Sequence, residues 1–314
     1  RPEVSAIIPA FNAERYVAQS IQSVLDQSFQ DLEVIVVDNR STDQTAVIAE
    51  QFVDSMVRVV KCNKQGAGAA RNSGLQCSTG AYIQFLDADD LLAPNKFETQ
   101  LKVIKSKDPI KTVASCEWLR FEGSPNEAYL TLEEVWTEED PVEWIVSSLA
   151  GGGMMQTGAW LVHRDLINAA GPWDESLSLH DDGEFFTRVL LQAKSQQFVP
   201  GTRVYYRNVP GSLSGKRDHS AIESAFRVCQ SRDRHLLARR DDNRTREAIA
   251  TQYAQFAYEF SAISPELSNL AMQRIREIKR SPVNNIGGAR FRQLVDLVGF
   301  RFALSLRRAV LARK

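Results

Sequence analysis

Three carboxylates lie within four residues, at Asp87, Asp89 and Asp90, directly after the apolar run over residues 81–86. Such a run indicates a buried strand, and open α/β sheets bind ligands at the carboxyl ends of their strands. Carboxylates this close repel one another, so they favour a neutralising cation, and hard oxygen ligands suit Mg²⁺ or Mn²⁺. The alternative is a solvated acidic turn ahead of a helix that begins near Pro94.

Three further groups of candidate site residues each follow a predicted strand. The strands span Val4–Ile8, Leu32–Val37 and Val57–Val60, and the groups that follow them are Pro9, Ala10 and Phe11, then Asp38, then Gly66 to Arg71. Because the carboxyl ends of parallel strands lie along one edge of a sheet, we expect these groups to face the same crevice as Asp87.

The order of the predicted elements places these residues in an α/β domain. Continuous apolar strands, the fourth over Tyr82–Leu86, alternate with helices, which indicates a parallel sheet covered on both faces. Asn12 is expected to cap the first helix, and another helix is expected to start within Gly66–Asn72. We therefore predict a doubly wound, mostly parallel sheet in the N-terminal half.

The rest of the chain is less regular. Between Cys116 and Gly153 the periodic signal weakens, and later strands are expected at Thr157–His163 and Arg203–Tyr206. Beyond Gly215 the pattern is helical throughout. The predicted organisation is an α/β domain over residues 1–214, followed by a helical C-terminal extension over residues 215–314.

The last predicted helix combines an apolar stripe with flanking arginines. Its stripe consists of Phe291, Leu294, Val295, Val298, Phe302 and Leu306. Residues 281–314 contain seven basic residues and one acid, a local charge of +6, so the rest of a chain with net charge −1 carries −7. A basic helix of this kind can lie on an anionic membrane, or it can pack on the body with a solvated charged face. Nucleic acid is not expected as the partner, because no aromatic-studded basic groove accompanies the charge.

The cysteines and the hydropathy bear on the compartment. The four cysteines, Cys62, Cys77, Cys116 and Cys229, lack the paired spacing of zinc sites or disulfide frameworks, so we expect reduced thiols. No signal-peptide pattern opens the chain, and no apolar run reaches the length that a spanning helix needs. The expected location is the cytoplasm, with the basic helix able to hold the protein at the cytoplasmic face of the membrane.

Several sequence blocks, in one order, resemble the inverting family 2 glycosyltransferases of GT-A fold. The blocks are VSAIIPAFN at residues 4–12, VVDNRSTD at 36–43, GAARNSG at 68–74, FLDADD at 85–90, GPWDESL at 171–177 and DGEF at 182–185, followed by Arg188. The resemblance covers residues 4–214, and the final hundred residues lie outside it. Agreement of many short blocks is more specific than any one of them.

The resemblance implies roles for the donor-binding residues. Asp38 corresponds to the aspartate that binds the nucleotide base, although a carboxylate here could also cap a helix. Pro9, Ala10 and Phe11 would form the wall of the base pocket, and Arg71 would reach the base or a phosphate.

The resemblance also implies the residues of the reaction itself. Asp87 and Asp89 match the DxD motif, with Asp87 towards ribose or metal and Asp89 on the metal that clamps the diphosphate. Asp182, the second acid of an adjacent pair with Asp181, matches the base that removes the acceptor's proton. The alternative is that both acids only favour the start of a helix through its dipole.

Three positions depart from the family's pattern. Asn39 and Arg40 stand where the family commonly has a second Asp and a Gly, which bears on the base and ribose contacts. Val209 stands where some members carry a metal-binding His, so the third metal ligand would be water or His219. The segment Gly66–Arg71 is not a dinucleotide fingerprint, because Arg71 occupies the place of the last glycine.

The expected function is a metal-dependent inverting glycosyltransferase. It would move a sugar from a nucleotide-diphosphate donor, a UDP-sugar by preference, to a hydroxyl of a glycan or lipid-linked acceptor, with Mn²⁺ or Mg²⁺ as cofactor. A non-catalytic sugar-nucleotide-binding scaffold stays open, because of Asn39, Arg40 and Val209. Nucleotidyl transfer also stays open, although it would ordinarily need a glycine-rich phosphate loop after the first strand.

Overall fold

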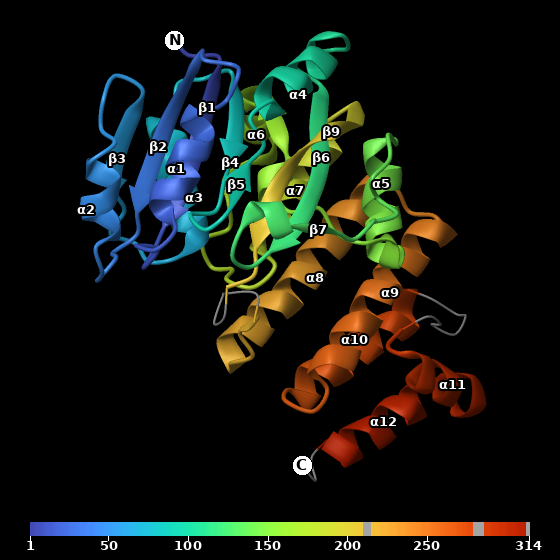
Figure 1. Ribbon diagram of the computed structural model, residues 1–314. Coiled ribbons are helices and arrows are strands. Elements are labelled where there is room, and N and C mark those ends of the chain that lie inside the picture. Colours follow the sequence, from blue (N-terminus) through green and yellow to red (C-terminus); the bar gives the residue numbers. More distant parts are fainter. Residues whose placement is uncertain (210–214, 279–285, 312–314) are drawn as a thin grey trace. The chain divides into compact units, whose positions relative to one another are not determined.

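The computed structural model describes residues 1–209, 215–278 and 286–311, and Figure 1 traces them. The chain divides into two compact units. The first unit comprises Arg1–Pro141, Met154–Ser176 and Arg188–Ser212, and the second comprises Val142–Gly153, Leu177–Thr187 and Leu213–Lys314. The helical second unit thus takes two short segments from within residues 1–214.

The strands of the described residues all belong to the first unit. They are β1 (Val4–Ala10), β2 (Leu32–Asp38), β3 (Val57–Lys61), β4 (Tyr82–Phe85), β5 (Leu91–Leu92), β6 (Thr112–Phe121), β7 (Tyr129–Leu130), β8 (Leu161–His163) and β9 (Ser195–Arg207). Within the described ranges they form one sheet in the order β3-β2-β1-β4-β8-β6-β9-β5, and β7 pairs with β6.

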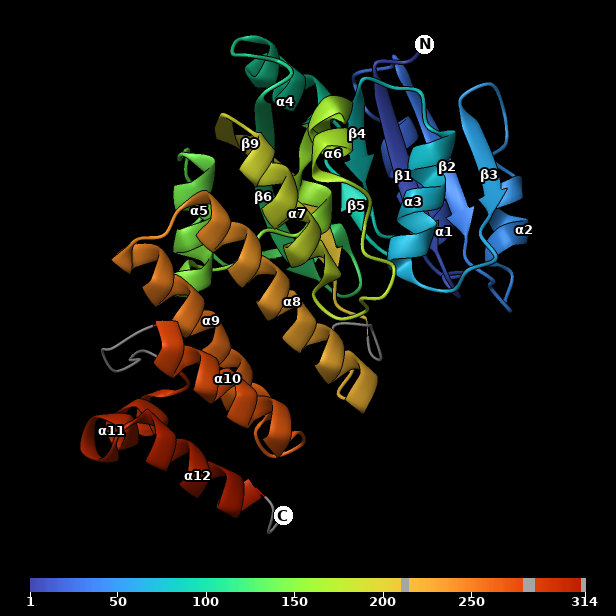
Figure 2. The same cartoon turned by 180° about the vertical axis from the view of Figure 1, so that it is seen from behind.

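The N-terminal half of this sheet is parallel, as predicted. Val4 of β1 lies opposite Leu32 of β2 on one side and Tyr82 of β4 on the other. The helices α1 (Val17–Leu25) and α2 (Thr45–Glu50) cover one face, and α3 (Ala67–Cys77) covers the opposite face, as Figures 1 and 2 show from the two sides. Gly74 allows α3 to approach β1, because an added Cβ would lie 2.3 Å from the Ile7 side chain.

The other half of the sheet is mixed, and much of it was not expected. The ten-residue strand β6 lies between β8, to which it is antiparallel, and β9, to which it is parallel. Polar residues such as Glu117 and Arg120 interrupt its apolar pattern, which is why the sequence signal weakens there. The predicted strand over Thr157–His163 is wrong in its first half, because Thr157–Ala159 form a 3₁₀ turn and β8 begins at Leu161.

The first helix does not begin at Asn12 as predicted. It begins at Val17, and Asn12 instead has a positive φ of 49°. Its side-chain Oδ1 accepts a hydrogen bond from the Thr42 backbone N–H at 2.8 Å. This hydrogen bond joins the loop after β1 to the loop after β2. The left-handed backbone is tolerated because the side chain of Asn is short and polar.

The remaining helices of more than one turn are distributed between the units. They are α4 (Lys96–Lys105) and α6 (Arg164–Ala170), then α5 (Pro141–Ser147) and α7 (Asp181–Gln192), and then α8 (His219–Arg239), α9 (Asn243–Phe260), α10 (Pro265–Ile278), α11 (Ala289–Val298) and α12 (Phe300–Leu311). Asp218 and Asp242 cap α8 and α9 by accepting hydrogen bonds from Ala221 N–H and Thr245 N–H. Apolar stripes of α8 and α9 meet through Phe226, Tyr253 and Phe256.

The C-terminal helix is not the single helix that was predicted. It breaks at Gly299, whose φ of +78° favours glycine, into α11 and α12. The predicted stripe is divided as well: Phe291 is buried, whereas Phe302 is 57% exposed and Leu306 is 41% exposed. The side of α12 that carries Phe302 and Leu306 therefore faces solvent.

Two further observations bear on the expected compartment. All four cysteines lie in the described residues, and none of them is disulfide-bonded. Among the helices of the described ranges, none combines the length and the hydropathy that crossing a bilayer requires.

Candidate functional site

The ends of β1 and β2 bring the predicted base-pocket residues together. Ala10 lies opposite Asp38 in the parallel register, and Pro9 lies opposite Val37. Asp38 is buried, and its Oδ1 accepts a hydrogen bond from Ser41 N–H at 3.2 Å. Phe11, one residue beyond β1, is 49% exposed. This edge therefore combines a fixed carboxylate with an accessible aromatic ring.

Asn39 holds the loop after β3 against this edge. Its N–H donates to the Ala10 carbonyl at 2.8 Å, its Nδ2 donates to the Lys64 carbonyl at 2.7 Å, and its Oδ1 accepts from Gly66 N–H at 2.8 Å. Arg40 follows with a φ of 66°. A glycine would adopt this backbone conformation readily, which explains in physical terms why the resembled family commonly has one there. Asn39 is thus committed to positioning the loop.

Arg71 connects the start of α3 to the carboxylate cluster. It is buried, its Nη2 donates to Asp87 Oδ1 at 2.9 Å, and its guanidinium lies 4.4 Å from the centre of the Trp173 ring. The neighbouring Asn72 fixes the Trp173 backbone, donating to its carbonyl at 3.0 Å and accepting from its N–H at 2.9 Å. The GPWDESL block is thereby bound to the GAARNSG block, although about a hundred residues separate them.

The three aspartates of the cluster have different environments. Burial, and next the charge of Asp87, raises the pKa of Asp89 to about 6. Burial, followed by the charges of Asp89 and Asp87, raises the pKa of Asp90 well above its ordinary value. Asp90 is fully buried and accepts hydrogen bonds from Gln156 Nε2 at 2.6 Å and from the Arg207 backbone N–H at 2.8 Å. Asp90 is therefore an anchor of the fold, whereas Asp87 and Asp89 are only partly buried and Asp87 pairs with Arg71.

Arg207, at the end of β9, completes the cluster and was missed by sequence reasoning. Its Nε donates to the Asp89 carbonyl at 2.8 Å, and its Nη2 donates to Gln19 Oε1 at 2.7 Å. Its guanidinium also lies between two rings, 4.3 Å from the centre of Phe121 and 4.6 Å from that of Tyr16. An arginine that closes an apolar strand was the only signal that could have indicated this role.

The carboxylates of Asp87 and Asp89 fit a hard divalent cation. Both offer oxygen ligands, and positive charge would relieve the repulsion from Asp87 that, after burial, raises the pKa of Asp89. Over the part of the chain that the structure describes, no group of three or more His, Cys, Asp or Glu side chains is arranged to hold a metal. These two aspartates would therefore supply part of a coordination shell, and a bound ligand or water would supply the rest.

Asp182 belongs to the second unit, at the N-terminus of α7. Its Oδ1 accepts a hydrogen bond from Gly183 N–H at 2.7 Å, while Asp181 Oδ1 accepts from Asp182 N–H at 3.0 Å. Glu184 is buried and accepts from Ser231 of α8 at 2.8 Å. Asp182 is half-buried, whereas Asp181 and Glu184 are buried. Of the three acids, Asp182 thus has the most access to a ligand.

Two histidines and Arg188 have structural contacts. His163 Nδ1 accepts from Asp165 N–H at 3.2 Å and caps α6. His219 opens α8, with Glu223 at 3.5 Å and Glu266 at 3.7 Å. Arg188 donates to the Ala170 carbonyl at 2.6 Å, at the end of α6. Val209, the position at which some members carry a metal-binding His, directly precedes residues 210–214, which lie outside the described residues.

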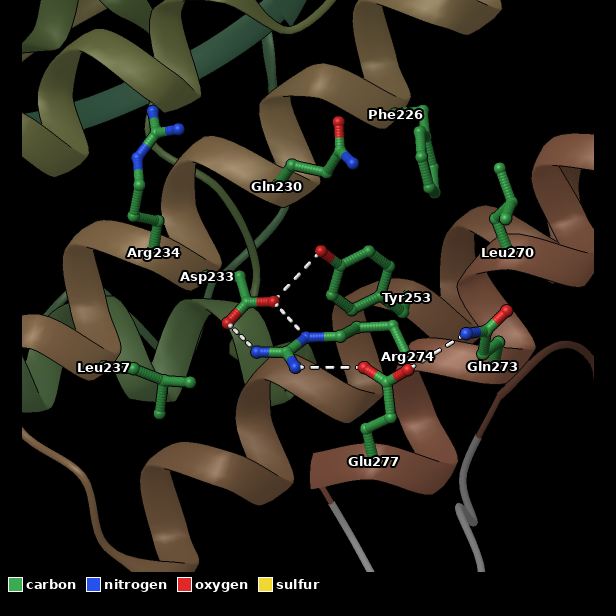
Figure 3. Close-up of a pocket in the computed structure, with 10 residues that line it drawn as sticks. All are labelled: Phe226, Gln230, Asp233, Arg234, Leu237, Tyr253, Leu270, Gln273, Arg274 and Glu277. Atoms are coloured by element: carbon green, nitrogen blue, oxygen red, sulfur yellow. Dashed lines mark hydrogen bonds and ion pairs between the residues drawn. The ribbon is translucent and has the colours of Figure 1, made fainter.

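A cavity of about 530 Å³ in the second unit lies among α8, α9 and α10 (Figure 3). Asp233 forms a two-point ion pair with Arg274, at 2.7 and 3.1 Å, and accepts from the Tyr253 hydroxyl at 3.1 Å. Arg274 also donates to Glu277 at 3.2 Å. The hydrogen bond to Asp233 raises the pKa of Arg274, and burial raises that of Tyr253. The ion pairs and hydrogen bonds among these side chains therefore hold the three helices together.

Comparison with known proteins finds similar sequences for the first part of the chain. Residues 5–155 match the sequence model of glycosyl transferase family 2. Glycosyltransferase GlyG of Streptococcus pneumoniae serotype 4 is 26% identical over 226 residues, 67% of this chain and 72% of that protein. The putative teichuronic acid biosynthesis glycosyltransferase TuaG of Bacillus subtilis is 34% identical over 146 residues, 46% of this chain and 58% of that protein.

A solved structure supports the fold over more of the chain. The structure of S. aureus TarS residues 1–349 in complex with UDP-GlcNAc has a TM-score of 0.63 and 18% identity, and the match covers 88% of this chain and 89% of that one. The expected fold class is thereby confirmed, including its helical C-terminal region. Over residues 5–155 this chain is thus similar to glycosyl transferase family 2, and its enzyme class is that of a glycosyltransferase.

Proposed function

We propose that this enzyme transfers a sugar from a nucleoside diphosphate sugar to a hydroxyl of a glycan or lipid-linked acceptor, with inversion at the anomeric carbon. The observation that carries the proposal is the pair of carboxylates, Asp87 and Asp89, at the carboxyl end of β4 beside Arg71. A UDP-sugar is the favoured donor, since similar TarS structures hold UDP-GlcNAc and UDP. Synthesis of a cell-envelope polysaccharide is the favoured setting, as the name of the similar TuaG suggests.

The base and ribose would be held at the ends of β1 and β2. Asp38 can accept a hydrogen bond from a base N–H such as that of uracil, while the exposed ring of Phe11 can stack on the base. Pro9 and Ala10 supply the backbone wall of the pocket. Because Asn39 is engaged by the Cys62–Gly66 loop, the ribose contacts fall to other groups, of which Asp87 is the candidate.

Asp89 and Asp87 would hold Mn²⁺ or Mg²⁺, and the bound cation supplies positive charge to the diphosphate leaving group. Arg71 orients Asp87 through their ion pair at 2.9 Å. Arg207 holds the main chain of Asp89 through a hydrogen bond to its carbonyl. These residues act on the donor by binding and orienting it.

Asp182 would take the proton from the acceptor hydroxyl as that oxygen attacks the anomeric carbon. Its half-buried place at the start of α7 and its fixed backbone contacts support this assignment. Replacement of Asp182 by Asn should lower kcat by about 10²- to 10⁴-fold while leaving donor affinity unchanged. Donor binding lost together with kcat would instead assign Asp182 to the donor site.

We place the enzyme at the cytoplasmic face of a membrane, where a lipid-linked acceptor would be reached. The exposed apolar side of α12, with Phe302 and Leu306 next to Arg301 and Arg308, supports this location. Flotation with anionic liposomes tests it, and protein that stays in the soluble fraction would contradict it.

The decisive experiment combines a thermal-shift panel with product identification. UDP, GDP, dTDP and CDP are each tested with Mn²⁺, Mg²⁺ or a chelator, on the parent and on Asp89→Ala. A ligand that binds only the folded state raises its melting temperature, so we expect a metal-dependent shift with UDP that the variant loses.

Product identification separates the alternatives. Release of a nucleoside diphosphate from a sugar nucleotide supports glycosyl transfer, whereas release of pyrophosphate would indicate nucleotidyl transfer. Binding of UDP without any transfer to hydroxyl acceptors or water would move the assignment to a non-catalytic scaffold.

A further inference from the structure

A pocket of about 250 Å³ in the second unit is built from residues of α10 and α12 and from Ser261 in the turn after α9. Its polar groups include the hydroxyls of Ser261 and Ser268 and the guanidinium groups of Arg276, Arg301 and Arg308. We call it the arginine–serine pocket. It lies outside the family match at residues 5–155 and contains none of the residues proposed for donor or acceptor chemistry.

The two serine hydroxyls are buried without a partner. Ser261 is 2% exposed and Ser268 is 3% exposed. Across the described residues, no group lies within hydrogen-bond distance of the Oγ of either serine. A buried hydroxyl without a hydrogen-bond partner is uncommon in folded proteins. Both serines line the pocket, and an acceptor that reached either Oγ would supply the missing hydrogen bond.

The three arginines are likewise not neutralised by contact. Within the described chain, none of Arg276, Arg301 and Arg308 forms an ion pair within 4 Å. Two acids, Glu266 and Glu277, interact with these arginines only through longer-range electrostatics, and both form hydrogen bonds with other side chains. The pKa of Glu266 is lowered first by its hydrogen bond with Ser264 and least by Arg308, and that of Glu277 is lowered first by Gln273 and then by Arg274. The pocket itself is lined by no acid.

Three guanidinium groups and two hydroxyl donors match a tetrahedral oxyanion. Arginine binds phosphate oxygens through two parallel N–H bonds, and serine hydroxyls can donate to the remaining oxygens. We propose that the arginine–serine pocket binds the phosphate group of a phosphomonoester or phosphodiester. The volume suits a phosphate with a small substituent rather than a nucleotide.

The phosphate can come from a lipid headgroup or from a soluble molecule. Arg301 and Arg308 share α12 with the exposed side chains of Phe302 and Leu306. An anionic phospholipid would use both features, because its headgroup would enter the pocket while the apolar side chains meet the acyl region. A soluble phosphorylated molecule would use the pocket alone.

The first test measures binding of inorganic phosphate to the full chain by calorimetry, with the ionic strength held constant by chloride. Arg301→Gln/Arg308→Gln removes two charges from the pocket, and Arg290→Gln/Arg292→Gln removes two charges from the neighbouring α11. We expect affinity to fall about tenfold or more in the first variant and to stay unchanged in the second. Equal affinity in both variants, or no phosphate binding by the parent, would overturn the proposal.

Ser268→Ala separates binding from folding. The substitution removes a hydroxyl that has no partner in the described structure, so the melting temperature should not fall. Phosphate affinity should nevertheless fall about threefold or more, because a donor to the anion is lost. Unchanged affinity in Ser268→Ala would exclude the serine-lined pocket as the site.

The second test identifies the source of the phosphate by co-sedimentation with vesicles. Phosphatidylglycerol vesicles are compared with phosphatidylcholine vesicles, with the parent and the same two double variants. Binding to phosphatidylglycerol that is lost in Arg301→Gln/Arg308→Gln supports a lipid headgroup. Phosphate binding without vesicle binding supports a soluble ligand. The Asp89→Ala variant should behave as the parent in both tests, so a failure of the proposed transferase chemistry leaves these results unaffected.

Discussion

The molecule contains two clusters of acidic side chains that differ in how their charge is balanced. In the first unit, Asp87, Asp89 and Asp90 crowd together, and the pKa of Asp89 is raised to about 6 by burial and by Asp87. In the second unit, Asp233 is buried among helices, and it forms a two-point ion pair with Arg274. We call these the DxD cluster and the helical cluster.

The difference distinguishes the proposed metal and donor site from a cluster that has a structural role. The helical cluster pairs its groups within the protein, so it gains nothing from an added ion and holds α8, α9 and α10 together (Figure 3). The DxD cluster retains repulsion that a bound cation would relieve. Burial alone therefore does not indicate function here, because Asp233 is also buried and has Arg274 as its basic partner.

The largest expected effect comes from removing the carboxylate of Asp89. Asp89→Ala should lower turnover by about 10³-fold or more, because the cation that stabilises the leaving group would lose a ligand. The stability of the protein without ligand should not fall, since a repelling charge is removed. Turnover assays and urea unfolding in the presence of chelator measure the two effects. Retained turnover would break the distinction between the clusters.

Removing Asp233 should have the opposite profile. Asp233→Ala leaves Arg274 and Tyr253 without their shared partner and should lower the free energy of unfolding by about 3 kcal/mol. Donor affinity should stay within twofold of the parent. Urea unfolding and a UDP titration at a temperature where the variant is folded measure both quantities. A specific loss of UDP binding in the folded variant would contradict the structural role.

The pH dependence of stability should differ between the parent and Asp89→Asn. Folded Asp89 keeps its proton up to about pH 6, whereas the unfolded side chain releases it near 3.8, so the folded state binds more protons in this range. Stability of the ligand-free parent should therefore fall as the pH rises from about 4 to about 6, by about 2 kcal/mol relative to Asp89→Asn. Saturating Mn²⁺ should reverse the trend, because it binds the ionised carboxylate. Parallel curves with chelator would rule out the raised pKa.

The smallest expected effect is a change in KM that distinguishes Phe11 from Phe226. Phe11→Ala should raise KM for the donor about tenfold with kcat nearly unchanged, because a stacking surface for the base is lost. Phe226→Ala in the second unit should leave KM unchanged and lower stability instead, since Phe226 packs against Tyr253 and Phe256. Steady-state kinetics on both variants provide the comparison, and a shared KM effect would refute it.

The sequence predicts best where burial on both faces makes strands continuously apolar. The strands β1, β2 and β4 and the residues at their ends were found in this way, which placed Asp38 and Asp87 on one edge. The strand β6 was not found, because Glu117 and Arg120 interrupt its pattern. The break at Gly299 had a signal in its glycine, but the exposure of Phe302 depends on which neighbours α12 has.

Contacts between residues far apart in the sequence could not be predicted from the sequence. Arg207 donates to the Asp89 carbonyl 118 residues away, and Gln156 donates to Asp90 66 residues away. Neither residue has a local pattern that names its partner. The role of Asp90 as an anchor of the fold therefore required the tertiary structure, whereas the position of the cluster and the proposed role of Asp89 did not.

The place of β8 in the sheet has a consequence for synthesis on the ribosome. β8 lies between β4 and β6, although both of these strands are made before it. Until residues 161–163 emerge from the ribosome, the edges of β4 and β6 that pair with β8 have no partner strand. Arg207, which contacts Asp89, emerges later still. A fragment trimmed to the family match at residues 5–155 would remain in that condition permanently, so we expect it to aggregate where the full chain stays dispersed.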